Sequence, residues 1–427
     1  MVSEAASLAS SKEKLKLSSD QMPFSISDKW HQKSRDWTGR LFFNIASLCT
    51  EPACKMHEKN TFLKLARSEP KPPNVTEKLS QLAQKTYLCA QVSLLLPITV
   101  FTGTIGMFFR LFGYFTQSSE FNHLKGNLKE KDFPTDNKAS IFFLNTCFIG
   151  GGYPLTNGGV LPWKSRINQV IEKIEKADAD IVCLSEIYDF KASQILYNKL
   201  KDKYAHFYLN IGPHFFGAKS GLLVASKYKI QNPHFIDFHN TLVHNKNSNR
   251  RGCFAFEAIN KENKPIAKVY STHLEYSEDD SNPTDGEKKA RKDEIDLIIN
   301  DIKNSEVVSP TILTGDLNFS KDEYDKTDLV TYFRKTNTDN KGTCRRDEFN
   351  KKLWNQKIDE KAKKENAFDL DHTFILRKSP KDEKKLTKFR VSTKIIPCFD
   401  EPSEIKDKED ILKALSDHHA MKIEIKI

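Results

Sequence analysis

From residue 139 onward, short apolar segments alternate with helical patterns, and this alternation constrains the fold more than any other feature of the sequence. Two segments, 163–177 and 293–302, repeat Ile and Val at helical spacing. Other segments have the length and the β-branched and aromatic content of strands: SIFFLNTCFI, DIVCLSEI, GLLVASKYKI, CFAFEAI, IAKVYSTHLEY, TILTGDLNF, HTFILR and AMKIEIKI. Because some strands follow one another directly and others have a helix between them, we expect an α/β protein with two packed sheets.

Polar side chains interrupt or end these apolar segments. In TILTGDLNF, Asp316 and Asn318 are two residues apart, so in a strand they point to the same side. A carboxylate beside an amide can bind a divalent cation or a phosphate, although the same pair can also cap a turn. Similar residues lie at the ends of other segments: Asn145, Glu186, His273 with Glu275, Asp371, and Asp417 with His418. Because ligand sites of α/β proteins gather at strand ends, this recurrence predicts one shared site.

The order Asn, Glu, His, Asp-x-Asn, Asp and Asp-His resembles the endonuclease/exonuclease/phosphatase superfamily, which has the deoxyribonuclease I-like fold. The resemblance covers about residues 139–427, and the motifs that carry it are LSE, STHL, GDLN and SDH. Within that superfamily the sequence is most similar to the neutral sphingomyelinases, through EIYDFKASQILYNKLKDKY, SGLLVASKYKI, and NRRGCFAFEAI followed by STHLEYSEDD. It departs from them at Ser185, where relatives often carry Gln or Asn, and at 419–421, where an aromatic residue and Pro-Val commonly follow.

This resemblance implies both a fold and an activity. The implied fold is a four-layer α/β sandwich, in which two packed mixed β-sheets are flanked by helices. The implied activity is the Mg2+-dependent hydrolysis of a phosphodiester in the headgroup of a membrane phospholipid. The resemblance to sphingomyelinases makes sphingomyelin the expected substrate, ceramide and phosphocholine the expected products, and Mn2+ a substitute for Mg2+.

The resemblance also implies roles for the polar residues. Oxygen ligands suit a hard cation such as Mg2+, and the implied ligands are Glu186 and Asn145, with Asp417 either binding an additional metal or holding the His418 loop. The implied catalytic residues are His418 as general base, Asp371 to hold its tautomer, Asp316 to position water, Asn318 to bind the phosphate, and His273 to donate to the developing charge. A choline cation requires an aromatic face. The expected substrate contacts are Tyr188 and Phe216 for the choline and Asn318 for the phosphate.

Residues 88–109 contain no charged residue and are long enough to cross a bilayer. Pro97, Gly103 and Gly106 also suit a bent re-entrant or hairpin insertion, and a buried helix of a globular domain is a further alternative. Because the run exceeds the usual length of a core helix, we expect a membrane-associated protein. The first residues are polar and lack the apolar core of a cleavable signal peptide.

Composition divides the sequence into four regions. Residues 1–86 are polar and expected to be partly disordered or loosely helical, 87–114 form a hydrophobic membrane-associated segment, 115–137 a linker, and 138–427 the catalytic domain. Eight cysteines without a CxxC pair predict no disulfide framework. The net charge of +10 suits nucleic acid, an anionic membrane surface or an acidic substrate, and does not choose among them.

Three other functions stay open at this stage. An endonuclease on the same fold would use the positive charge to bind phosphate backbones, which makes nucleic acid an alternative partner. A phosphoinositide phosphatase would also depend on Mg2+ and face a membrane. A catalytically silent, membrane-anchored binding protein would keep the fold without the reaction, but the complete set of catalytic-type residues argues against it.

Overall fold

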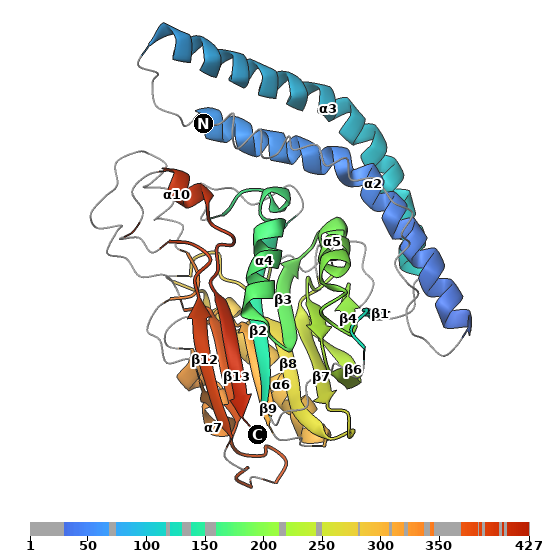
Figure 1. The fold of residues 1–427 in the computed structure, drawn as a ribbon, viewed down its shortest axis with the longest axis vertical. Coiled ribbons are helices and arrows are strands. Elements are labelled where there is room, and N and C mark those ends of the chain that lie inside the picture. The colour runs from blue at the N-terminus through green and yellow to red at the C-terminus, as the bar shows by residue number, and fades with distance from the viewer. Residues whose placement is uncertain are drawn as a thin grey trace.

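Two β-sheets packed face to face form the centre of the protein (Figure 1). The seven-stranded sheet has the order β1-β4-β5-β3-β2-β13-β12, and the six-stranded sheet has the order β10-β11-β9-β8-β7-β6. Neighbouring strands are antiparallel, except that β2 pairs with β3 and β8 with β9 in parallel. This computed structural model describes residues 30–67, 74–116, 120–129, 138–149, 159–212, 219–244, 250–280, 282–306, 310–319, 323–336, 342–345, 369–382, 384–386, 389–400, 404 and 408–426.

The strands and helices have the following bounds. The strands of the first sheet are β1 (Asn122–Lys125), β2 (Lys138–Phe148), β3 (Ile181–Ile187), β4 (His206–Leu209), β5 (Leu223–Ser226), β12 (Arg390–Ile396) and β13 (Ala420–Lys426). Those of the second are β6 (Lys229–Asp237), β7 (Gly252–Ile259), β8 (Pro265–His273), β9 (Thr311–Asp316), β10 (Phe333–Lys335) and β11 (Asp371–Leu376). The helices are α2 (Trp30–Arg67), α3 (Val75–Thr116), η3 (Trp163–Ser165), α4 (Ile167–Ala177), α5 (Phe190–Leu200), α6 (Asp285–Asn304), η4 (Tyr324–Lys326), α7 (Leu329–Tyr332) and α10 (Lys408–Leu412).

The central strand β2 is apolar on both faces because it separates two hydrophobic cores. Ile141 and Phe143 belong to the core between the sheets, whereas Phe142 and Leu144 belong to the core on the outer side. Successive side chains of a strand point to opposite faces, so a strand buried on both sides has an unbroken apolar sequence. The predicted four-layer α/β sandwich is confirmed.

Helices supply the two outer layers. Val170 of α4 and Leu196 of α5 pack against the outer face of the first sheet. Ile295 and Ile298 of α6 pack against the second sheet. Helix α6 begins with a capping box, in which Thr284 and Glu287 satisfy each other's backbone N–H groups. The helical spacing of Ile and Val in both segments therefore marks the buried stripe of each helix.

The first sheet extends further toward the N-terminus than the sequence suggests. Strand β1 lies within residues 115–137, which were expected to form a linker, and pairs antiparallel with β4. Its sequence, NHLK, is too short to show a period of two. Only its pairing with a strand more than eighty positions away, with Asn122 opposite Leu209, makes it a strand.

Two long helices precede the sandwich. Helix α2 covers much of the region 1–86 that was expected to be partly disordered or loosely helical; residues 1–29 lie outside the described residues. Helix α3 contains the uncharged run 88–109. Among the described residues it is the one helix long and apolar enough to cross a membrane, by length and composition alone.

We expect substitution of Phe143 by Ala to destabilise the sandwich by about 3–5 kcal/mol, because the side chain is fully buried between the sheets. Leu297 of α6 is 36% exposed, so Leu297→Ala should cost about 1 kcal/mol or less. Urea denaturation followed by circular dichroism measures both values. Equal losses in the two variants would contradict the assignment of the core.

Candidate active site

Two pairs of parallel strands bring polar side chains to one end of the sandwich. In the first sheet, β2 and β3 run in parallel and place Asn145 opposite Ser185, next to Glu186. In the second sheet, β8 and β9 run in parallel and place His273 opposite Asp316. Because parallel strands end at the same edge of a sheet, each pair delivers its terminal side chains together.

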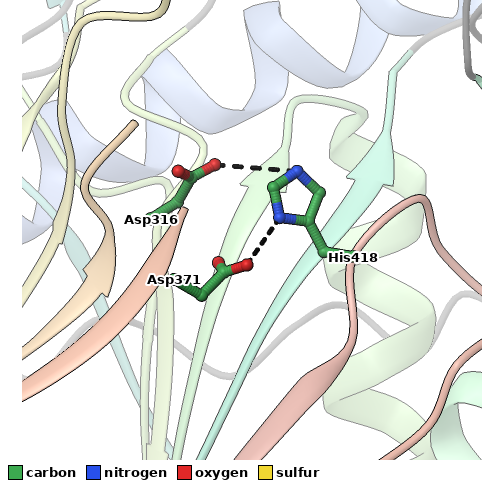
Figure 2. A group of neighbouring side chains, drawn as sticks. All are labelled: Asp316, Asp371 and His418. Carbon is green, nitrogen blue, oxygen red and sulfur yellow. Dashed lines mark hydrogen bonds and ion pairs between the residues drawn. The ribbon is translucent and has the colours of Figure 1, made fainter. Parts of the chain in front are cut away.

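His418 lies between two carboxylates at the centre of this group (Figure 2). Its Nδ1 is 2.7 Å from Oδ2 of Asp371, and its Nε2 is 3.8 Å from Oδ2 of Asp316. Asp371, Asp316 and His418 are 0%, 1% and 5% exposed, so water screens their interactions weakly. Asp371 and Asp316 are directly opposite each other in the β11–β9 ladder, which fixes their spacing.

Asn145 connects this group to the first sheet. Its Nδ2 donates to Oδ2 of Asp316 at 2.9 Å and lies 3.5 Å from Nε2 of His418. Its Oδ1 accepts from the backbone N–H of Cys147 at 3.1 Å. The loop before β13 is tied to the same strand end, since the Ser416 hydroxyl donates to the Asn145 carbonyl at 2.6 Å and accepts from the His418 N–H at 3.2 Å.

A buried arginine lies beside His273. Nη1 of Arg251 is 3.0 Å from Nε2 of His273, which is itself 3.6 Å from Asp316 and 3.9 Å from Glu186. A guanidinium can only donate, so Nε2 of His273 accepts in this arrangement. Burial, together with the charges of Arg251 and His418, holds the pKa of His273 well below its usual value, which keeps the imidazole neutral. That His273 donates to the charge developing on the substrate stays a prediction, and Arg251 is a second donor beside it.

Glu186 and Asp417 form the acidic side of the group. The Glu186 side chain is 17% exposed. Burial, followed by the neighbouring carboxylate of Asp417, raises the pKa of Glu186 to about 7. Two carboxylates in one poorly hydrated place repel each other, and a bound divalent cation would relieve that repulsion. The donor chemistry of Glu186, Asp417 and the Asn145 amide oxygen therefore fits a hard cation.

The central histidine and its partner have shifted pKa values. Burial alone would lower the pKa of His418, but the carboxylates of Asp371 and Asp316 outweigh it and hold the pKa well above the usual value. Burial raises the pKa of Asp371 to about 6, although the charge of His418 opposes the rise. The two groups interact strongly, so their protonation is shared between them.

Three residues at the strand ends have left-handed backbone conformations. Their φ angles are 50° for Cys147, 60° for Glu186 and 50° for Asn318. Asn tolerates this conformation, whereas a residue such as Glu loses roughly 1–3 kcal/mol in it. The turn at Glu186 redirects its side chain just before the end of β3. Local strain thus coincides with the candidate site.

The structure brings most of the predicted site residues together: Asn145, Glu186, His273, Asp316, Asp371 and His418 are linked by the contacts above. Asn318 caps the end of β9, with its N–H donating to Asp316 and its Nδ2 donating to the Leu274 carbonyl at 3.1 Å. Tyr188 is half-buried, with its ring against Gly221. Phe216 lies outside the described residues.

Two arginines of the site region were not predicted. Arg251 follows Asn249 and Arg250 in the NRRG stretch, where its charge alone does not distinguish it from a surface residue. Arg166 is buried and donates to the carbonyls of Leu161, Thr146, Cys147 and Leu415. It thereby joins the end of β2 to the loop before β13. Both arginines are distinguished from surface residues by their burial, which a single sequence does not show.

A second set of metal donors overlaps the catalytic group. One ligand atom from each of Asp316, Asp371 and His418 lies within 4.8 Å of the others, close enough to hold a metal ion. In the present geometry the Nδ1 atom of His418 is bonded to Asp371. A divalent metal can therefore be accommodated by the site residues in more than one way.

Comparison with known proteins agrees with the predicted family. The model of the Endonuclease/Exonuclease/phosphatase family matches residues 144–360, just over half of the chain. A search of curated protein sequences gives no match. The predicted membership of this family is confirmed.

Solved structures with a similar fold include three distant ones. SmcL is 18% identical, with a TM-score of 0.48 over 68% of this chain and 99% of that one. D. rerio TDP2 humanised by 14 mutations is 14% identical, with a TM-score of 0.47 over 68% of this chain and 100% of that one. Sphingomyelinase C from Streptomyces griseocarneus is 16% identical, with a TM-score of 0.45 over 67% of this chain and 99% of that one. On the match of the family model, this chain belongs to the Endonuclease/Exonuclease/phosphatase family of metal-dependent phosphodiesterases and related hydrolases.

Proposed function

We propose that the protein is a Mg2+-dependent phosphodiesterase that acts on the headgroup of a membrane phospholipid, with sphingomyelin as substrate and ceramide and phosphocholine as products. The observation that carries this proposal is the buried group in which His418 lies between Asp371 and Asp316. A hydrolase needs a base for water beside positive charge for a phosphate, and this group together with Arg251 has both.

His418 would take the proton from the attacking water. Its Nδ1 is bonded to Asp371, which fixes the tautomer and leaves Nε2 to accept the proton. Asp316, 3.8 Å from Nε2, would hold the water by a hydrogen bond. General-base catalysis of this kind contributes about 10²–10⁴ in rate.

Positive charge and hydrogen-bond donors would bind the phosphate. The buried guanidinium of Arg251 reaches the site beside His273, and its charge is little screened there. The Asn318 amide has two N–H groups, one of which donates to Leu274. These groups would stabilise negative charge that develops on the phosphate oxygens.

Glu186, Asn145 and Asp417 would hold the metal through oxygen atoms. When bound, the cation would supply positive charge to the phosphate and to the leaving alkoxide. The support for this assignment is the pKa of Glu186, raised to about 7 by burial and by neighbouring carboxylates that a cation would neutralise.

A membrane lipid fits the surroundings of the site better than a soluble substrate does. Helix α3 carries an apolar run long enough to anchor the protein at a bilayer. Tyr188 follows Glu186 by two positions and has Glu186 and Arg251 as electrostatic neighbours, and its ring would contact the choline cation. The protein would accordingly act at a membrane surface.

Substitution of His418 by Ala should lower the hydrolysis of sphingomyelin vesicles by roughly 10²–10⁴, because the base is lost. The measurement is phosphocholine release by the full-length protein with Mg2+. His419→Ala serves as the matched control, since the His419 ring stacks on Phe399 and its Nδ1 accepts from Cys398 instead of facing the carboxylates.

The same assay compares substrates. Nicking of plasmid DNA without phosphocholine release would favour an endonuclease, and release of inorganic phosphate from a phosphoinositide would favour a phosphatase. Turnover by His418→Ala near that of the wild type would contradict the assignment of the base.

Activity should rise with pH through a midpoint above the usual histidine pKa, because His418 must be deprotonated to act and Asp371 and Asp316 raise its pKa. Asp371→Asn removes the largest of these carboxylate effects, so the midpoint should move to lower pH. The plateau rate should also fall by about 10² or more, since the tautomer is no longer held. A pH profile of kcat/KM measures both changes, and an unchanged midpoint would contradict the proposed pairing.

Glu186→Gln should weaken the metal dependence. An amide keeps the shape of the carboxylate but loses its charge, so the Mg2+ concentration for half-maximal activity should rise by about tenfold or more. Isothermal titration with Mg2+ checks binding independently of turnover. An unchanged titration would remove Glu186 from the ligand set and favour the group Asp316, Asp371 and His418.

A further inference from the structure

Helix α2 packs along the whole apolar run of α3. The rings of Phe42 and Phe109 are 6.0 Å apart. A Cβ atom at Gly106 would lie 2.9 Å from that of Cys49, so the two helices approach closely there. At one end Arg67 donates to the Cys89 sulfur, and at the other Arg35 donates to the Phe115 carbonyl. One side of α3 is therefore covered by protein from residue 89 to residue 115.

The covering helix is charged and is joined to the catalytic domain at its middle. Glu51 pairs with Lys164 at 2.8 Å and with Lys191 at 2.7 Å. Glu58 lies 3.9 Å from Lys164. Gln194 of α5 donates to Asn44 at 3.4 Å. Helix α2 thus lies between α3 and the start of α4 and α5, as Figure 1 shows.

The opposite side of α3 is exposed and apolar. Leu94 and Phe101 are each 69% exposed, and Phe108 is 60% exposed. The hydroxyls within the run do not make this side polar, since Thr102 and Thr104 donate to carbonyls of their own helix. The charged Arg110 is half-buried and has Asp189 of the catalytic domain as an electrostatic neighbour.

Exposed basic side chains occur on both helices of the pair. They are Arg35, Lys55, Lys64 and Arg67 of α2 and Lys78 of α3, which follows the exposed Glu77. The α2 carboxylates whose side chains the structure describes, Glu51 and Glu58, are instead used in ion pairs with the catalytic domain. A helix pair that carries both an exposed apolar strip and exposed Lys and Arg is complementary to anionic lipid headgroups and the acyl region below them.

We propose that α3 lies in the plane of the membrane surface, with Leu94, Phe101 and Phe108 inserted among the lipids, and does not cross the bilayer. A bilayer that surrounded α3 would also enclose the charged α2 and the domain to which Glu51 is paired, at a prohibitive cost. Only the uncovered side of α3 can therefore meet lipid. This inference rests on the proposed action at a membrane and specifies its geometry.

This geometry places the active site at the membrane surface. Helix α2 contacts the starts of η3 and α5, which follow the ends of β2 and β3. Asn145 and Glu186 lie at those same ends. The helix pair and the catalytic group therefore lie at one end of the sandwich.

Flotation with vesicles of phosphatidylcholine and phosphatidylserine tests the inserted face. In the full-length protein, Leu94→Asp with Phe101→Asp should weaken vesicle binding by at least about tenfold, because each Asp would enter the acyl region. Leu297→Asp, on the exposed part of α6, should bind as the wild type does. Circular dichroism confirms that the variants fold. Wild-type protein that fails to float would overturn the proposal.

A topology measurement separates the in-plane from the spanning arrangement. The full-length chain, with an epitope tag at each end, is synthesised in the presence of sealed microsomes and treated with protease. Both tags should be digested without detergent. Protection of one tag would show that α3 crosses the membrane and would overturn the proposal.

The remaining outcomes are also distinguishable. If the two Asp substitutions reduce the oligomer size in the absence of lipid and leave flotation unchanged, the exposed face binds a second copy, and the proposal is wrong. Hydrolysis of sphingomyelin in detergent micelles reports on the active site alone. Loss of flotation with normal micelle activity supports the inference, whereas normal flotation of the wild type without micelle activity would remove the proposed substrate and leave the in-plane helix intact.

Discussion

The short hydrogen bond between His418 and Asp371 joins the two sheets at the functional end of the sandwich. Asp371 begins β11 in the second sheet, and His418 precedes β13 in the first. The bond from Asn145 of β2 to Asp316 of β9 crosses between the sheets in the same way. Along most of their length the sheets are held by apolar side chains. At this end the contact becomes polar, and buried polar groups are stable only when each has a partner.

That requirement explains why many hydrogen bonds join the side chains and the backbone around the site. The Ser416 hydroxyl, the Arg166 guanidinium and the Thr343 hydroxyl all bond to backbone groups near the catalytic side chains. Burial disfavours the charged forms of Glu186 and Asp371, and it raises the pKa of both carboxyl groups. In the proposed function, a bound cation would reduce the repulsion between these carboxylates.

The sequence predicted the elements whose signals are local. The unbroken apolar run of β2 and the spacing of Ile295 and Ile298 in α6 follow from burial on two faces and on one stripe, respectively. The polar residues that the structure brings together could be predicted because each lies within or beside an apolar segment. Strand β1 was missed because only its distant partner β4 makes it a strand. Arg251 was missed for a related reason: its importance comes from burial next to His273, a contact between residues in different strands.

The helix pair is attached to the sandwich next to the segments that follow strands β2 and β3. Asp189 caps α5, accepts a hydrogen bond from Trp163 and follows Glu186 by three positions. Lys164, which follows Trp163, and Lys191, two positions after Asp189, both bind Glu51 of α2. Burial alone would raise the pKa of Glu51, but hydrogen bonds from the two lysines lower it to about 2, so the carboxylate stays charged at neutral pH. In the proposed arrangement, the ion pairs of Glu51 therefore connect the helix pair at the membrane surface to the residues that follow the proposed metal ligand Glu186.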